Sequence, residues 1–197
     1  PVFIAAETKS SNSDIKIDIP ISSGSITHLC GPSGVGKSVL IESIVGINGS
    51  FNVEVNDEQG DAIHLNDFRA LIAYASQGSA LFVATVRQNI AWMETVHDKS
   101  VESLMAIVDL PSKFIDQDIK YLSGGQKQRV IIARSLYLNK KILILDEPFV
   151  GLDSVATEQL VISIIREFPH TALLLCHHGK FKNREFVREV YLSDCFF

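Results

Sequence analysis

The stretch Gly31-Pro32-Ser33-Gly34-Val35-Gly36-Lys37-Ser38 decides the fold of this chain, because it fits the phosphate-loop pattern GxxxxGK[ST] at every required position. Glycines allow backbone N–H groups to converge on phosphate oxygens with no Cβ atom in the way. We expect Lys37 to reach the β- and γ-phosphates of a nucleotide and the Ser38 hydroxyl to ligate Mg²⁺. All eight residues are therefore predicted to line a nucleotide site.

The residues on either side of this loop have the periodicities that a phosphate loop requires. Ile26 to Cys30 reads as a buried strand that leads into the loop. After Lys37 the apolar residues recur with helical spacing, at Leu40, Ile41, Ile44 and Val45. Gly46 is a plausible end for that helix. A strand, a glycine-rich turn and a helix form the context in which this motif is credible.

The rest of the chain alternates strands with helices, which predicts a mainly parallel sheet with helices on both faces. The expected strands are 51–55, 71–76, 141–146 and 171–176, and the expected helices are 124–138 and 155–168. Isoleucines at every second position from Ile15 to Ile21 predict an N-terminal β part with one buried face. The predicted fold class is α/β: a P-loop NTPase core with a mainly parallel sheet, an N-terminal antiparallel β part and an inserted helical lobe.

Composition narrows the class of protein further. The 197 residues carry 18 Lys and Arg against 23 Asp and Glu, a net charge of −5, so we expect no nucleic-acid partner. The three cysteines, Cys30, Cys176 and Cys195, show no CxxC spacing and are expected to be reduced thiols. No apolar run approaches the roughly 18 residues that a membrane span needs.

Asp146 and Glu147 follow the apolar run 142–145 directly. They are expected at the C-terminal end of a central strand, where open α/β sheets place their ligands. Asp146 is predicted to hold Mg²⁺, directly or through water, and Glu147 to polarise the attacking water. Neighbouring residues of a strand point to opposite sides, so the two carboxylates need not share one task.

Leu122-Ser123-Gly124-Gly125-Gln126 is a second glycine-rich helix start that suits a phosphate. One nucleotide has one triphosphate, but this chain has two segments that suit a phosphate. This indicates that two chains face each other and that each supplies half of two ATP sites. With this segment the chain resembles the nucleotide-binding domain of ATP-binding cassette (ABC) proteins, and the resemblance covers nearly the whole sequence. Gln77 resembles the Q-loop glutamine of that family, 151–153 the D-loop and His177 the switch histidine.

The resemblance implies ATP and Mg²⁺ as cofactors and a role for each motif. Ser123, Gly124, Gly125 and Gln126 would contact ATP on the opposite protomer, and Asp153 would communicate across the dimer. Gln77 would sense Mg²⁺ and the attacking water. His177 would hold the γ-phosphate and orient Glu147, with His178 as a rival for that role that strand length disfavours.

A single ATPase domain is expected over residues 1–197, with 1–77 and 129–197 as the core and 78–128 as the helical lobe carrying the signature. The segment from Leu81 to Ile90 resembles exporter-type cassettes, and Phe82 and Trp92 are the side chains expected to receive a membrane-domain helix. The alternative is that these apolar residues only pack the helical lobe. Two departures from the family pattern are Thr8, which stands where an adenine-stacking aromatic residue is usual, and the segment 116–121, which lacks the exporter Gly-Glu pattern.

The predicted function is therefore the Mg-ATP-hydrolysing motor of an ABC membrane transporter, most readily an exporter, on the cytoplasmic side of a membrane. Its predicted partners are a second ABC domain, identical or related, and a transmembrane domain that is fused or on a separate chain. The alternatives are an importer ATPase subunit and a soluble ABC ATPase outside transport. The absence of heptads between Ser38 and Leu122 counts against the chromosome-organising class. Nothing in the sequence identifies the cargo.

Overall fold

A parallel sheet of five strands forms the centre of the described part of the chain, in the order β5-β6-β7-β3-β8. The strands are β3 (Ile26–Cys30), β5 (Ile72–Ser76), β6 (Ile142–Asp146), β7 (Ala172–Cys176) and β8 (Val187–Tyr191). This computed structural model describes residues 1–8, 16–92, 98–149, 152, 154–179, 181 and 187–192. Because the strands are parallel, their carboxyl ends meet at one edge of the sheet.

The two faces of the sheet belong to different hydrophobic cores, because side chains alternate along each strand. On β6, Leu143 and Leu145 pack into one core, whereas Ile142 and Ile144 pack into the other. All five residues of β6 and all five of β7 are buried. A continuous apolar run is what a strand with both faces covered requires, so the prediction of buried central strands is confirmed.

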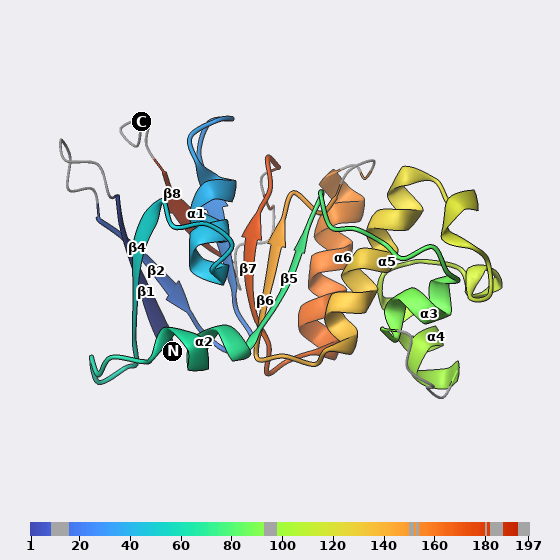
Figure 1. The fold of residues 1–197 in the computed structure, drawn as a ribbon, viewed down its shortest axis with the longest axis horizontal. Helices are drawn as coiled ribbons and strands as arrows, with labels where there is room; N and C mark the ends of the chain where they lie inside the picture. Colours follow the sequence, from blue (N-terminus) through green and yellow to red (C-terminus); the bar gives the residue numbers. More distant parts are fainter. Residues whose placement is uncertain are drawn as a thin grey trace.

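A second, antiparallel sheet contains β1 (Val2–Thr8), β2 (Lys16–Ile21) and β4 (Phe51–Asn56), in the order β2-β1-β4. Its inward side chains share a core with helix α1 (Lys37–Val45) and with one face of the parallel sheet. Figure 1 shows this sheet at one end of the elongated molecule, with α1 beside it. The predicted antiparallel β part is therefore confirmed, and β4 lies at its edge, where the alternation of 51–55 predicted an edge strand or a hairpin.

The opposite face of the parallel sheet is covered by α5 (Gly124–Tyr137) and α6 (Ser154–Glu167), whose apolar residues join the other core. Figure 1 shows these two helices between the parallel strands and the far end of the molecule. Helices on both faces of a parallel sheet confirm the predicted α/β class. Helix α2 (Leu65–Ala70), strand β1 and strand β8 were not predicted from the sequence.

The part of the chain between β5 and α5 is mainly helical. It contains α3 (Val86–Ile90), α4 (Asp98–Ile107) and the 3-10 turns Ser112–Phe114 and Ile119–Tyr121. The boundaries 78 and 128 for this lobe remain a prediction. None of the helices in the described ranges combines the length and the apolar character that crossing a bilayer requires.

Candidate functional site

The loop between β3 and α1 has a backbone shape that only glycine adopts easily. Gly31, Gly34 and Gly36 have φ angles of 148°, 82° and 94°. A Cβ atom at Gly31 would lie 2.7 Å from the carbonyl oxygen of Leu192, so this position has no room for a side chain. At Gly34 a Cβ would meet nothing within 4 Å, so the φ angle alone favours glycine there.

Lys37 closes this loop on itself. Its side chain is buried, and its Nζ donates to the carbonyl oxygens of Gly31 and Pro32 over 2.9 and 2.7 Å. The ammonium group is therefore held at the start of α1, beside the backbone that is predicted to cradle phosphate. A phosphate entering the loop would offer this cation a stronger, charged partner than the two carbonyl groups.

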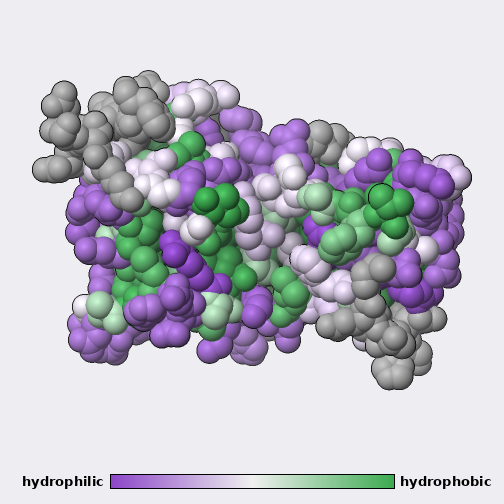
Figure 2. All heavy atoms as spheres, in the orientation of Figure 1, coloured by the Kyte–Doolittle hydropathy of each residue, from purple (hydrophilic) through white to green (hydrophobic). Residues whose placement is uncertain are grey.

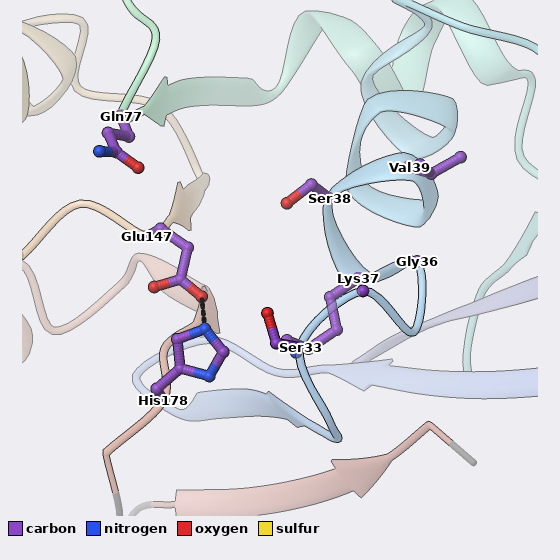
Figure 3. Close-up of a pocket in the computed structure, with 9 residues that line it drawn as sticks. Ser33, Gly36, Lys37, Ser38, Val39, Gln77, Glu147 and His178 are labelled. Atoms are coloured by element: carbon purple, nitrogen blue, oxygen red, sulfur yellow. Dashed lines mark ion pairs between the residues drawn. The ribbon is translucent and has the colours of Figure 1, made fainter. Parts of the chain in front are cut away.

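A cavity of about 440 Å³ opens between this loop and the carboxyl ends of β5, β6 and β7. The residues that line it are Ser33, Gly34, Gly36, Lys37, Ser38, Val39, Gln77, Glu147 and His178. Figure 3 shows the phosphate loop on one side of the cavity and Gln77, Glu147 and His178 on the other. Segments that are far apart in the sequence therefore meet at the edge of the sheet where ligands are expected.

Asp146, the last residue of β6, is hydrogen-bonded to Ser38 of the phosphate loop. The Ser38 Oγ donates to Asp146 Oδ1 over 3.1 Å. Burial raises the pKa of Asp146, and the bond from Ser38 partly opposes that rise. A hydroxyl and a buried carboxylate in contact are oxygen ligands of the kind that Mg²⁺ prefers, so this pair fits the predicted metal site.

Glu147 leaves the strand geometry that Asp146 keeps. Its φ angle is 49°, in the left-handed region, and its N–H donates to the carbonyl oxygen of Cys176 on the neighbouring strand over 3.0 Å. This turn directs the carboxylate into the cavity (Figure 3). The thiol of Cys176 lies 3.8 Å from Glu147 Oε1, and burial raises the pKa of that thiol, which keeps it protonated.

His178, and not His177, lies beside Glu147. The His178 Nε2 is 3.0 Å from Glu147 Oε1, and the side chain lines the cavity. The ring of His177 instead packs edge-on against Phe149, with centroids 5.4 Å apart. The structure therefore places His178, the rival of the preferred His177, at the cavity: β7 ends at Cys176, and the bend at His178 brings that side chain there. Which of the two histidines acts on the γ-phosphate remains a proposal.

Gln77 follows β5 directly, and its N–H donates to the carbonyl oxygen of Asp146 over 3.2 Å. This bond extends the pairing of β5 with β6 by one residue beyond the strands. The Gln77 side chain lines the cavity on the side of Glu147. The structure thus brings together Lys37, Ser38, Gln77 and Glu147 as predicted, while their individual roles remain proposals.

Comparison with known proteins establishes the family. Residues 15–150 match the ABC transporter family. This chain belongs to that family. A probable sulfate/thiosulfate import ATP-binding protein of Chlorella vulgaris is 33% identical over 190 residues, which cover 91% of this chain and 80% of that protein. An aliphatic sulfonates import ATP-binding protein of Pseudomonas savastanoi pv. phaseolicola is 34% identical over 184 residues, covering 90% of this chain and 70% of that protein.

Solved ABC structures share the fold. The ATP-binding cassette MJ0796, described as a dimer bound to ADP and Pi, superposes with a TM-score of 0.74 at 25% identity, covering 98% of this chain and 95% of that one. A bacterial Atm1-family ABC exporter with ATP bound also superposes with a TM-score of 0.74, but at 22% identity and over 37% of its chain. The predicted ABC ATPase fold, ATP binding and ATPase activity are confirmed, whereas the exporter subclass is not.

The ABC signature lies at the start of α5 and away from the cavity just described. Ser123 and Gln126 form a reciprocal cap: the Ser123 Oγ accepts from the N–H of Gln126, and the Gln126 Oε1 accepts from the N–H of Ser123. A Cβ at Gly124 would meet nothing within 4 Å, so the helix start is open to solvent. None of the signature residues lines the cavity. Asp153, the remaining residue of the predicted trans site, lies outside the described residues.

The two aromatic residues predicted to receive a membrane-domain helix lie together. Phe82 and Trp92 are each 42% exposed, and their ring centroids are 5.8 Å apart. The guanidinium of Arg134 lies over both rings, 5.7 and 4.8 Å from their centroids. Figure 2 shows a hydrophobic area on the surface over the helical part of the molecule. Sequence reasoning missed Arg134, because nothing in the spacing of α5 marks a residue that reaches the 80–92 segment.

Proposed function

We propose that this chain is the ATP-hydrolysing motor of an ABC importer, working as a head-to-tail dimer on a membrane partner. The observation that carries the proposal is the cavity in which Lys37 and Ser38 face Glu147 and His178. The relatives named as import ATP-binding proteins favour import over the exporter type that the sequence predicted. The exporter type remains the alternative, supported by the exporter-like segment from Leu81 to Ile90.

In the proposed mechanism, the residues of the cavity position the triphosphate and the attacking water. Lys37 exchanges its two carbonyl partners for the β- and γ-phosphate oxygens. Ser38, Asp146 and Gln77 would hold Mg²⁺, which would neutralise charge on the phosphates. Glu147 accepts a hydrogen bond from the attacking water and draws its proton, and His178 fixes the direction of that carboxylate. Positioning and electrostatics then supply the catalysis.

The signature supplies the argument for a dimer. Ser123, Gly124, Gly125 and Gln126 present an open helix start that does not reach the cavity of their own chain. A helix N-terminus attracts phosphate through its free N–H groups and its dipole. A second copy placed head to tail would bring this helix start onto the γ-phosphate, with Asp153 near the interface. Dimer closure on ATP and opening after hydrolysis would be the mechanical output.

The variant Glu147→Gln tests this mechanism. It keeps the shape of the side chain but removes the base, so ATP should bind and hold a dimer that does not open. Size-exclusion chromatography with ATP should show a stable dimer, and phosphate release should fall by at least about 100-fold. The matched control is Glu54→Gln, on the exposed face of β4, which should behave as the wild type. Hydrolysis at the wild-type rate in Glu147→Gln would refute the role of this carboxylate.

A second experiment tests how this domain is joined to its membrane partner. The native complex is solubilised from membranes and purified through this domain, and its polypeptides are identified by mass spectrometry. Membrane spans on a separate polypeptide would support the importer proposal. Spans on the same polypeptide as this domain would favour the exporter type, and recovery with no membrane protein would favour an ABC ATPase outside transport.

A further inference from the structure

Three side chains with metal-binding atoms meet on the face of the sheet that α1 does not cover. His28 and Cys30 belong to β3, and Glu189 belongs to the neighbouring strand β8. Their candidate ligand atoms all lie within 4.8 Å of one another. The strand geometry explains this meeting, because residues two apart share a face and His28 stands opposite Glu189 in the parallel register.

Hydrogen bonds already orient two of these side chains. The backbone carbonyl of His177 can only accept, so the His28 Nε2, 2.9 Å away, donates to it. The Nδ1 of His28 therefore carries the lone pair, and it lies 3.4 Å from the Sγ of Cys30. The hydroxyl of Tyr191 donates to Glu189 Oε2 over 2.9 Å. Metal-binding imidazoles and carboxylates are usually held by outer partners of this kind.

The separation of the Cys30 sulfur and the His28 Nδ1 fits a single bound ion. A tetrahedral Zn²⁺, about 2.3 Å from sulfur and about 2.0 Å from nitrogen, would place those two atoms about 3.5 Å apart. One thiolate and one carboxylate would balance the charge of a divalent ion. A thiolate and an imidazole favour Zn²⁺ and discriminate against Mg²⁺.

We propose that His28, Cys30 and Glu189 bind a zinc-class divalent cation, with a fourth position open to water. When the ion binds, the Cys30 thiol loses its proton to solvent. The sulfur of Cys30 and the Nδ1 of His28 then both coordinate the ion. The ion joins β3, the strand that carries the phosphate loop, to β8. The site is separate from the Mg²⁺ position proposed at Ser38 and Asp146, and it does not depend on the importer proposal.

The test uses Zn²⁺ and Co²⁺ on the full chain after chelator treatment. Calorimetry should give one Zn²⁺ per chain, and Co²⁺ should produce the near-ultraviolet absorption of a thiolate–metal bond. Cys30→Ser should remove that absorption. Loss of an outer partner weakens metal binding by up to about 100-fold, so Glu189→Gln, which removes a direct ligand, should weaken Zn²⁺ binding by more than that. Tyr191→Phe, which removes only the hydroxyl that orients Glu189, should weaken binding by about tenfold.

The controls are Glu54→Gln, which should leave both signals unchanged, and millimolar Mg²⁺, which should not compete. Circular dichroism establishes that each variant is folded. A thiolate absorption that persists in Cys30→Ser, or an affinity for Zn²⁺ unchanged in folded Glu189→Gln, would overturn the proposal. Failure to bind Zn²⁺ at micromolar concentration would overturn it as well.

Discussion

Replacing the two adjacent histidines one at a time separates the residue that acts on ATP from the residue that packs. His178 is 56% exposed by its side chain and lies 3.0 Å from the Glu147 carboxylate. Loss of one preorganised hydrogen-bonding group at a reacting centre typically costs 10²- to 10³-fold in kcat, or about 2.7–4 kcal/mol. We therefore expect His178→Ala to lower kcat by about 10²- to 10³-fold. Its free energy of unfolding should change by less than about 0.5 kcal/mol, as for other surface positions.

His177→Ala should show the reverse pattern. Its ring packs edge-on against Phe149, an arrangement worth about 0.5–1.5 kcal/mol. The carbonyl of residue 177, which accepts from His28, survives the substitution. We expect a loss of stability of about 1 kcal/mol and a kcat within about threefold of the wild type.

Two assays read the two quantities separately. Phosphate release at saturating Mg-ATP gives kcat, and urea unfolding followed by circular dichroism gives the free energy of unfolding. His178→Gln, which keeps a donor but cannot be charged, measures how much of the effect needs an imidazole. A loss of more than 100-fold in His177→Ala, together with near wild-type turnover in His178→Ala, would refute the assignment and restore the sequence-based one.

Three further predictions concern Lys37, Gly31 and Tyr74. Lys37→Ala should weaken ATP binding by about 10- to 100-fold, because a charged hydrogen bond contributes about 1.5–3 kcal/mol; calorimetry measures this, and an unchanged Kd would contradict the role of Lys37. Gly31→Ala should lose about 1–3 kcal/mol of unfolding free energy and more than Gly34→Ala, since only at Gly31 would the new Cβ meet a backbone oxygen; equal losses in urea unfolding would contradict this. Burial raises the pKa of Tyr74 above its ordinary 10.0, so the folded state holds the phenol proton to higher pH than the unfolded state does, and the free energy of unfolding should fall as pH rises above 10. Tyr74→Phe should remove that part of the fall in urea unfolding measured against pH. The same pH dependence in Tyr74→Phe and the wild type would contradict this prediction.

The sequence predicts the core of the site because its signals are local. The glycines between Gly31 and Gly36 are required by the backbone angles of a single loop, and the apolar run before Asp146 is required by burial on both faces. Each pattern can be read without knowing what packs against it. The predicted helix after Lys37 and its end at Gly46, which has a φ angle of 86°, are confirmed for the same reason.

The sequence fails where a tertiary turn decides the outcome. Strand length favours His177, but the chain bends at His178 and brings that ring to the cavity, and the residue types there do not predict the bend. The sequence does not predict the left-handed conformation at Glu147 either, because glutamate is not a residue that favours it. Strand β8 pairs with β3 from the far end of the chain, and only this pairing brings Glu189 to His28.

The backbone at Glu147 also sets what selection for heat resistance would do to this protein. A side chain in the left-handed region costs on the order of 1–2 kcal/mol, and glycine avoids that cost. A screen that rewards survival at high temperature alone would therefore enrich clones in which this carboxylate has been discarded. Such clones would have a larger free energy of unfolding and would hydrolyse little ATP, so stability and activity are opposed at this position.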